Sequence, residues 1–250
     1  MQTDQHFMTD FRILGRIVSA AGIQPQDTVL EIGAGSGLLT RELAKRAKMV
    51  IAIEIDRGLE GELMNNLRGV GNVELVFGSA LETLKKRQSV FDRIVSNIPY
   101  SISEPLIQEL VYLDFRSAVL TLPRPFAWRL KAKPGDKGFS RLSIIAGEFF
   151  EIEILFDIPK DSFSPRPKTP SLAVSLKPKD KKSLFCRVVL CRKMKLKNAI
   201  MRGLFETRKY TKNQARKTIK SLKLNNLLDK KLSEMDTGEL KTVWQKLQKT

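Results

Sequence analysis

Residues 28–37 read TVLEIGAGSG, and this stretch decides how the first two-thirds of the chain fold. Thr28–Ile32 is short and rich in branched side chains, which is typical of a buried strand. Three glycines separated by single residues follow at once, and Leu38–Arg46 then has the apolar spacing of a helix. Such a turn lets the backbone approach a ligand closely at the carboxyl end of the strand. The spacing is GxGxG, not the GxGxxG of dinucleotide-binding proteins, so the turn predicts a ligand site without a pyrophosphate cradle.

Predicted strands and helices alternate on both sides of this stretch. The predicted strands are Thr28–Ile32, Met49–Ile55, Val73–Phe77, Phe91–Ser96 and Ser117–Leu122, and the predicted helices are Phe11–Ala21, Leu38–Arg46, Leu59–Leu67 and Ile102–Tyr112. This alternation predicts an α/β fold, a parallel sheet covered by helices on both faces. Two later strand-like runs, 149–156 and 171–176, flank a proline-rich loop and predict an antiparallel edge.

The positive charge of the chain is concentrated in its last third. The formal net charge is +17, yet residues 1–175 contain 22 basic and 21 acidic residues, whereas residues 176–250 contain 22 and 6. We therefore predict a first domain of residues 1–180 and a basic helical domain of residues 181–250. The helices predicted in the second domain are Phe185–Arg192, Lys197–Thr207, Lys212–Leu222, Asn225–Lys231 and Thr237–Leu247.

A domain with this excess of positive charge predicts a polyanionic partner, because neutralising phosphates releases their counterions. RNA is the expected polymer, and a solvated basic tail is the alternative. The residues expected to bind RNA are Arg202, Arg208, Lys209, Lys212, Arg216 and Lys217.

Composition argues against several other classes of protein. One histidine and two cysteines five residues apart do not provide the ligands of a metal cluster, so no metal is expected. No apolar run reaches the roughly 18 residues of a membrane span, and the polar start Met1-Gln2-Thr3-Asp4 lacks the features of a signal peptide. A monomeric cytoplasmic enzyme without membrane contact is expected.

The second predicted strand ends in Glu54, 21 residues after Gly33. At about this spacing an acidic residue meets the ribose hydroxyls of a bound nucleoside, since one carboxylate can accept two hydroxyl hydrogen bonds. Alone, Glu54 could be a solvated charge at a strand end. Together with the glycine turn, it indicates a nucleoside site.

Asn97-Ile98-Pro99-Tyr100 follows the fourth predicted strand, again at the carboxyl edge of the sheet. An adenine amine is a poor nucleophile because its lone pair is delocalised into the ring. The Asn97 side-chain oxygen and the Pro99 carbonyl could both accept hydrogen bonds from that amine, and Tyr100 could stack on the base. The loop therefore predicts methylation of such an amine from S-adenosylmethionine by positioning alone, without a metal. A proline turn with a capping asparagine is the alternative interpretation.

Several motifs of the chain, taken in order, resemble those of the KsgA-type ribosomal RNA adenine dimethyltransferases. The motifs are Gln5-His6-Phe7-Met8, the EIGAGSG turn, Glu54, the NIPY loop, Phe139–Ser143, and Ser162-Phe163-Ser164-Pro165-Arg166-Pro167-Lys168. The resemblance covers roughly residues 5–220. It implies a Rossmann-like class I methyltransferase domain, a small helical C-terminal domain, and dimethylation of adenines in a hairpin of small-subunit ribosomal RNA.

The resemblance also implies a role for individual residues. The expected cofactor-binding residues are His6, Met8, Gly33, Gly35, Glu54, Ile55, Ser79 and Asn97, and those expected to hold the target base are Asn97, Pro99, Tyr100 and Phe163. Ser79 stands where the family usually has an aspartate that reads the adenine amine of the cofactor. Two other functions stay open: a ribosome-assembly factor with little or no turnover, and a methyltransferase acting on adenine in large-subunit rRNA or in DNA.

Overall fold

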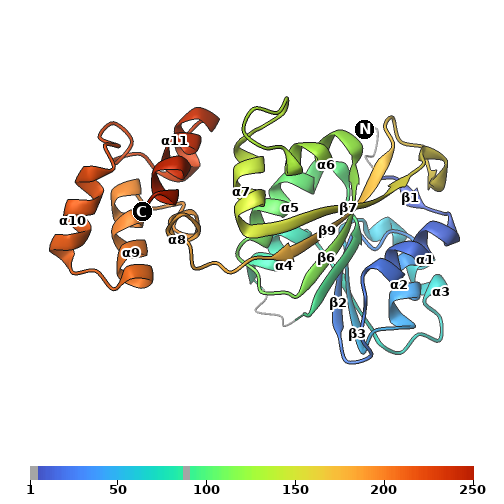
Figure 1. Cartoon of the computed structure of the whole chain (residues 1–250). Coiled ribbons are helices and arrows are strands. Elements are labelled where there is room, and N and C mark those ends of the chain that lie inside the picture. The colour runs from blue at the N-terminus through green and yellow to red at the C-terminus, as the bar shows by residue number, and fades with distance from the viewer. Residues whose placement is uncertain (1–4, 87–90) are drawn as a thin grey trace. The chain divides into compact units, whose positions relative to one another are not determined.

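The computed structural model of this chain describes residues 5–86 and 91–250. The predicted polar start, Met1–Asp4, lies outside the described residues. The central feature is a seven-stranded sheet with the order β4-β3-β2-β5-β6-β9-β7 (Figure 1). Its strands are β2 (Thr28–Ile32), β3 (Met49–Glu54), β4 (Val73–Phe77), β5 (Arg93–Asn97), β6 (Ser117–Pro123), β7 (Phe150–Ile158) and β9 (Ser171–Pro178).

The pairing of the strands confirms the predicted sheet. Strands β4, β3, β2, β5 and β6 are parallel, whereas β9 is antiparallel to both β6 and β7. The late strands therefore form the antiparallel edge that the sequence predicts. The central branched runs form strands buried among apolar neighbours, as in β2, where only Thr28 is more than slightly exposed, whereas the outer strand β4 is only half-buried.

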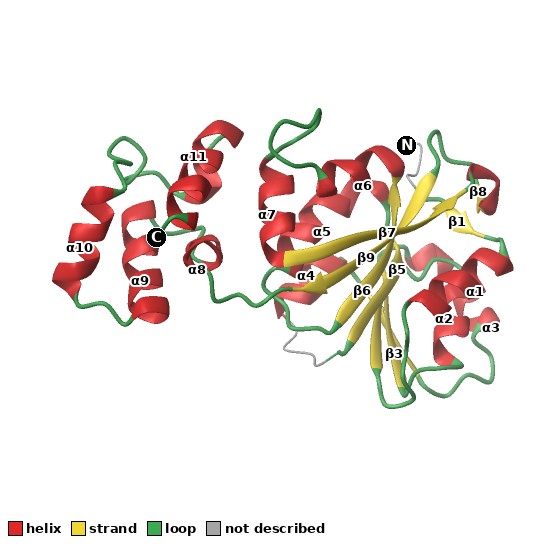
Figure 2. Cartoon of the chain, viewed as in Figure 1, coloured by secondary structure: helices red, strands yellow, loops and turns green. Residues whose placement is uncertain are grey.

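Helices cover both faces of this sheet (Figure 2). The first face carries α1 (Phe11–Ala20), α2 (Leu38–Ala44) and α3 (Glu60–Asn66), and the second carries α4 (Ala80–Lys86) and α5 (Ser103–Leu110). One core cluster joins α1 to the first face of the sheet and includes Leu14, Ile17, Val29, Val50 and Val95. The apolar residues of α1 recur with the period of a helix because one side of this helix packs against the sheet.

Sequence reasoning missed several short elements. These are β1 (Phe7–Met8), β8 (Phe163–Ser164), α4, α6 (Arg124–Lys131) and α7 (Arg141–Phe149). Strands β1 and β8 pair with each other as a separate antiparallel two-stranded sheet. Two residues are too few to show alternation, so only the fold makes these strands recognisable.

The chain divides into two compact units. The first comprises the described parts of residues 1–128 together with 150–178, and the second comprises 129–149 with 179–250. The second unit contains α7, α8 (Leu184–Leu190), α9 (Leu196–Arg208), α10 (Lys212–Ser221) and α11 (Thr237–Gln248). The predicted boundary at residue 180 stays a prediction, and the segment 129–149 was not expected to group with the C-terminal helices.

The predicted helix over Asn225–Lys231 is wrong. Helix α10 is followed by Lys223 in a left-handed conformation with φ 52°, after which residues 225–229 form turns. The carbonyls of Leu228 and Lys230 accept hydrogen bonds from the backbone N–H groups of Lys197 and Leu196, 2.9 and 2.8 Å away. This tertiary pairing outweighs the short apolar pattern of the segment.

No helix within residues 5–86 and 91–250 is long and apolar enough to span a membrane. In the same residues, no three His, Cys, Asp or Glu side chains are grouped so that they could hold a metal ion.

Candidate functional site

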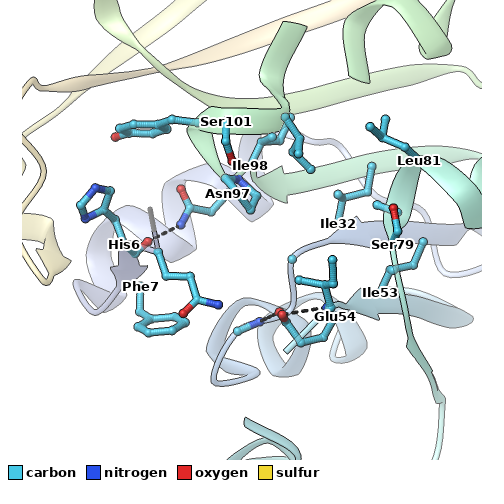
Figure 3. A pocket seen from close by; sticks show the side chains of 18 of the residues that line it. His6, Phe7, Ile32, Ile53, Glu54, Ser79, Leu81, Asn97, Ile98 and Ser101 are labelled. Atoms are coloured by element: carbon cyan, nitrogen blue, oxygen red, sulfur yellow. Dashed lines mark hydrogen bonds between the residues drawn. The ribbon is translucent and has the colours of Figure 1, made fainter. Parts of the chain in front are cut away.

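A cavity of about 310 Å³ opens at the carboxyl ends of the parallel strands. Its walls come from residues 5–7, 78–81 and 97–102, together with the ends of β2 and β3 (Figure 3). Strands β2 and β5 are neighbours, although the chain runs from β2 through β3 and β4 before it returns to β5. In open α/β sheets the crevice at such a reversal of strand order is the usual ligand site.

Gly33 and Gly35 of the turn after β2 line this cavity. Gly33, Gly35 and Gly37 have φ values of 79°, 57° and 83°, a region that other residues rarely adopt. A methyl group added to Gly35 would lie 2.8 Å from Cδ1 of Phe7. The turn therefore needs glycine both for its backbone angles and because the N-terminal segment packs directly against it.

Glu54 lies at the end of β3 and is buried, with 5% of its surface exposed. Its Oε2 accepts a hydrogen bond from the Gly35 N–H at 2.8 Å, and its Oε1 accepts from Ile55 and Asp56, both at 2.9 Å. Two carboxylate oxygens offer about four acceptor positions, so three backbone donors leave Glu54 able to accept more. Ile55 is 68% exposed at the mouth of the cavity, and Ser79 lies in its wall.

Glu31 is a buried acid next to the cavity-lining residues Ile32 and Gly33, and sequence reasoning did not single it out. It lies within β2, is 1% exposed, and has a pKa raised to about 8. Burial is the main cause; the Glu54 carboxylate raises this pKa further, and the Thr40 hydroxyl lowers it in part. The raised pKa favours the protonated, neutral form of Glu31, which lessens its repulsion with Glu54. Its signal in the sequence is an acid inside an otherwise apolar strand.

The Asn97 side chain is fixed by the N-terminal segment. Its Nδ2 donates a hydrogen bond to the backbone carbonyl of His6 at 2.8 Å (Figure 3). Because a carbonyl cannot donate, the amide nitrogen faces His6 and Oδ1 is left as the acceptor. Asn97 lies across the cavity from Glu54 in the same view.

Pro99 differs from its expected role in one respect. Its carbonyl accepts a hydrogen bond from the Ile102 N–H at 3.1 Å and from the Ser103 hydroxyl at 3.4 Å. The sequence predicted a carbonyl free to face a ligand. The 3₁₀ turn that begins at Tyr100 instead uses it, because the turn needs an acceptor three residues back.

Tyr100 lines the cavity and is held at both ends. Its phenol oxygen is 2.6 Å from the Ser171 hydroxyl oxygen, and its ring centroid is 5.4 Å from that of His6, with a 48° tilt. The His6 ring is in turn fixed, since Nδ1 lies 2.8 Å from the Pro165 carbonyl and donates to it.

Met8 and Phe163 do not reach the cavity as the sequence predicted. They face each other across the β1–β8 pair and belong to the apolar core, with 5% and 4% of their surface exposed. Two residues that precede Met8 in the chain, Gln5 and Phe7, line the cavity instead. Leu81 and Ser101 line it as well. Sequence reasoning assigned these four no role, although Gln5 and Phe7 belong to a motif it recognised.

The six basic residues predicted to bind RNA lie on α9, on α10 or in the turn between them, and their side chains reach the surface. Arg202 is paired with Glu206 one helical turn away, at 2.8 Å, and Arg208 donates to the Thr250 carbonyl at 3.1 Å. Lys209 ends α9 in a left-handed conformation, which turns the chain into α10. The fold thus brings all six to one pair of packed helices.

Comparisons with known proteins connect this site to a family. The model of the family described as "Ribosomal RNA adenine dimethylase" matches residues 1–235. A protein of Methanosarcina acetivorans named "Probable ribosomal RNA small subunit methyltransferase A" is 44% identical over 70% of this chain, and the match spans 64% of that relative. The protein of the same name from Methanosarcina mazei is 41% identical, over 79% of this chain and 76% of its own length. The crystal structure of a dimethyladenosine transferase from Plasmodium falciparum is similar with a TM-score of 0.67 and 30% identity, covering 98% of each chain.

Proposed function

The chain belongs to the ribosomal RNA adenine dimethylase family, and we propose that its cavity binds S-adenosylmethionine beside a loop that presents an adenine amine of small-subunit rRNA. The protein is a methyltransferase of rRNA adenines with a class I methyltransferase fold. The observation that carries the proposal for the site is the tether between Asn97 and the His6 carbonyl, which leaves one oxygen of Asn97 as an oriented acceptor. A cytoplasmic location and a monomeric state stay predictions.

The residues of the cavity fit S-adenosylmethionine. Gly33 and Gly35 line the cavity, and the Glu54 carboxylate, which accepts three backbone hydrogen bonds, keeps acceptor capacity for a ribose hydroxyl. Ile55 and Ser79 stand where an adenine ring could pack and be read. When bound, S-adenosylmethionine supplies a methyl group on a positively charged sulfur.

The chemical role of the chain is to orient the amine. A hydrogen bond from the amine to Asn97 Oδ1 favours a tetrahedral geometry at the amine nitrogen, so that its lone pair is no longer delocalised into the ring and points into the cavity. The Pro99 carbonyl can be a second acceptor when the Ser103 hydroxyl rotates away from its long contact of 3.4 Å. Tyr100 provides the ring on which the base stacks. Positioned dipoles and a held geometry of this kind account for large rate accelerations without a covalent intermediate.

A role for Phe163 on the second face of the base would require a movement of its side chain. That side chain is buried in the core, so it would have to leave its neighbours around Met8 to reach a base. His6 already stands beside the Tyr100 ring in the cavity wall.

Replacing Glu54 with alanine is expected to weaken S-adenosylmethionine binding by about 10- to 100-fold, because the hydrogen bond that its remaining acceptor position offers to ribose is lost. Calorimetric titration of the pure protein with S-adenosylmethionine measures the effect. Glu62→Ala, an exposed acid on α3, is the matched control and should leave the dissociation constant unchanged. An unchanged constant in Glu54→Ala would remove Glu54 from the cofactor site.

Binding of the basic helices to RNA predicts a strong dependence on salt. Replacing Arg208, Arg216 and Lys217 together with alanine should reduce the slope of log K against log salt by about 0.7–0.9 for each phosphate that is no longer neutralised. Filter binding or anisotropy with a hairpin RNA at several salt concentrations measures the slope. A control with the same change of charge replaces Lys45, Arg46 and Lys48, which lie at the surface near the end of α2. Equal slopes for the two triple variants would contradict the assignment.

The substrate is tested by transfer of labelled methyl groups to unmethylated small ribosomal subunits, to large subunits and to duplex DNA. Incorporation into the small subunit, on adenine and up to two methyl groups per base, is the expected result. Transfer mainly to large subunits or to DNA would show that small-subunit rRNA is not the substrate. No transfer by the wild-type protein would overturn the proposed reaction.

A further inference from the structure

Tyr100 owes its position in the cavity to a residue outside the cavity. Ser171 is the first residue of β9 and is fully buried, yet its hydroxyl oxygen lies 2.6 Å from the phenol oxygen of Tyr100. The two residues are 71 positions apart in the sequence. A bond this short between two hydroxyl groups is a well-formed hydrogen bond.

The register of the sheet explains why these residues meet. Asn97 at the end of β5 is paired with Thr121 on β6, and Thr121 is paired with Ala173 on β9. Ser171 lies two residues further toward the edge where the cavity opens, opposite Pro123. The chain that continues beyond Asn97 therefore passes over β6 and brings Tyr100 to the start of β9.

Ser171 is itself rigidly held. It is paired with Pro123 of β6 on one side and with Ile158 of β7 on the other, so it lies inside the sheet and not at its edge. The preceding residue, Pro170, accepts a hydrogen bond from the Arg124 N–H at 3.0 Å. A hydroxyl fixed in this way can hold a ring whose other end is set by the 3₁₀ turn at Tyr100.

We infer that Ser171 is a positioning residue for methyl transfer: through its hydroxyl it fixes the plane of the Tyr100 ring on which the target adenine stacks. This inference rests on the proposed function. Stacking on a base needs only the aromatic ring of Tyr100. The phenol hydroxyl has a separate role, because its hydrogen bond to Ser171 holds the ring in place. A free phenylalanine ring at this position could rotate and would hold the amine less accurately for reaction.

The test is a double-mutant cycle with Ser171→Ala and Tyr100→Phe, read as kcat and KM for the RNA. Each single variant is expected to lose about tenfold in kcat, with KM and the dissociation constant for S-adenosylmethionine changed less than about twofold. The double variant should be no slower than either single variant, because both changes remove the same hydrogen bond. Ser175→Ala, a buried serine four residues further along β9, is the matched control and should retain full kcat.

Each outcome supports or overturns a distinct claim. Full kcat in Ser171→Ala, or losses that multiply in the double variant, would overturn the inference while leaving the proposed function intact. A wild-type protein that transfers no methyl groups would instead overturn the proposed function. Melting temperature and S-adenosylmethionine affinity are measured on every variant. If Ser171→Ala does not fold, Tyr100→Phe alone decides the question. An unchanged kcat in Tyr100→Phe would then contradict the claim that the hydroxyl group anchors the ring.

Discussion

Replacing Asn97 with alanine is expected to lower kcat for methyl transfer by about a thousandfold and to weaken S-adenosylmethionine binding by a much smaller factor, because Asn97 also lines the cofactor cavity. The reason is that the amide has two separate tasks. Its Nδ2 is tied to the His6 carbonyl at 2.8 Å, and its Oδ1 is the acceptor that would orient the target amine. Single-turnover transfer to unmethylated small subunits, with calorimetry for cofactor binding, measures both quantities.

Asn97→Asp separates these two tasks. The aspartate keeps an oxygen that can accept from the amine, but it has no N–H for the His6 carbonyl and places an oxygen against it. We expect kcat of Asn97→Asp to lie between that of the wild type and that of Asn97→Ala, about 10- to 100-fold below the wild type. The reason is that a misplaced acceptor lowers the rate less than a missing one. Activity of Asn97→Ala close to that of wild type would show that this loop does not orient the substrate.

The second large effect concerns stability. Asp27, in the turn between α1 and β2, is fully buried and accepts hydrogen bonds from the Gln24 N–H at 2.9 Å, from Arg93 Nε at 2.5 Å and from Arg116 Nη2 at 2.7 Å. It ties together the amino-terminal ends of β2 and β5, at the sheet edge opposite the cavity. Asp27→Ala is expected to lower the free energy of unfolding by about 3 kcal/mol, because it leaves the largely buried Arg93 without its carboxylate. Urea denaturation followed by circular dichroism measures the change.

The same carboxylate makes stability depend on pH. Burial raises the pKa of Asp27, but hydrogen bonds from Gln24 and Arg93 and the charges of Arg93 and Arg116 outweigh burial, so the pKa is below its ordinary value. The folded state therefore binds this proton more weakly than the unfolded state does. The contribution of Asp27 to the free energy of unfolding is complete above its pKa in the unfolded chain, which is about 4. It is lost as the pH falls through the lower pKa that Asp27 has in the folded protein.

The control for this variant is Asp180→Ala, which removes an exposed carboxylate paired with Lys182. It should change neither the denaturation midpoint nor its pH profile measurably, since exposed ion pairs contribute little. The stability of Asp27→Ala should also fall less steeply with acid than that of the wild type. If both variants unfold at the same urea concentration, Asp27 does not hold the sheet edge.

The sequence predicted the elements of the sheet well because those elements are encoded locally. The strand bounds Thr28–Ile32 and Val73–Phe77 are the same in the structure, and the helices predicted to begin at Phe11 and Lys212 begin at those residues. The buried faces of Thr28–Ile32 and of the helix from Phe11 have a period that is visible within about ten residues, whereas Val73–Phe77 is half-buried and is marked by its branched and aromatic residues. Where the pattern was shorter or tertiary contacts dominated, prediction failed, as it did at Asn225–Lys231.

The candidate site was predictable only in part. The glycine turn, Glu54 and the NIPY loop could be found because each lies at or directly after the end of a strand in a parallel sheet, which places it at one edge. Phe163 was expected to face the ligand site but lies in the core, because its strand pairs with the N-terminal segment. Nothing in the local sequence of residues 162–168 indicates that pairing.

By itself, the sequence determined the class of fold, the edge of the sheet where chemistry can occur, and the chemical types of the groups found there. Only the tertiary structure decided how those groups are oriented. The amide of Asn97 is set by a carbonyl 91 residues away, and the Tyr100 ring is anchored by a hydroxyl 71 residues away. The reason is physical: a strand and its turn follow from local periodicity, whereas a hydrogen bond between distant segments exists only after the sheet has assembled in one register.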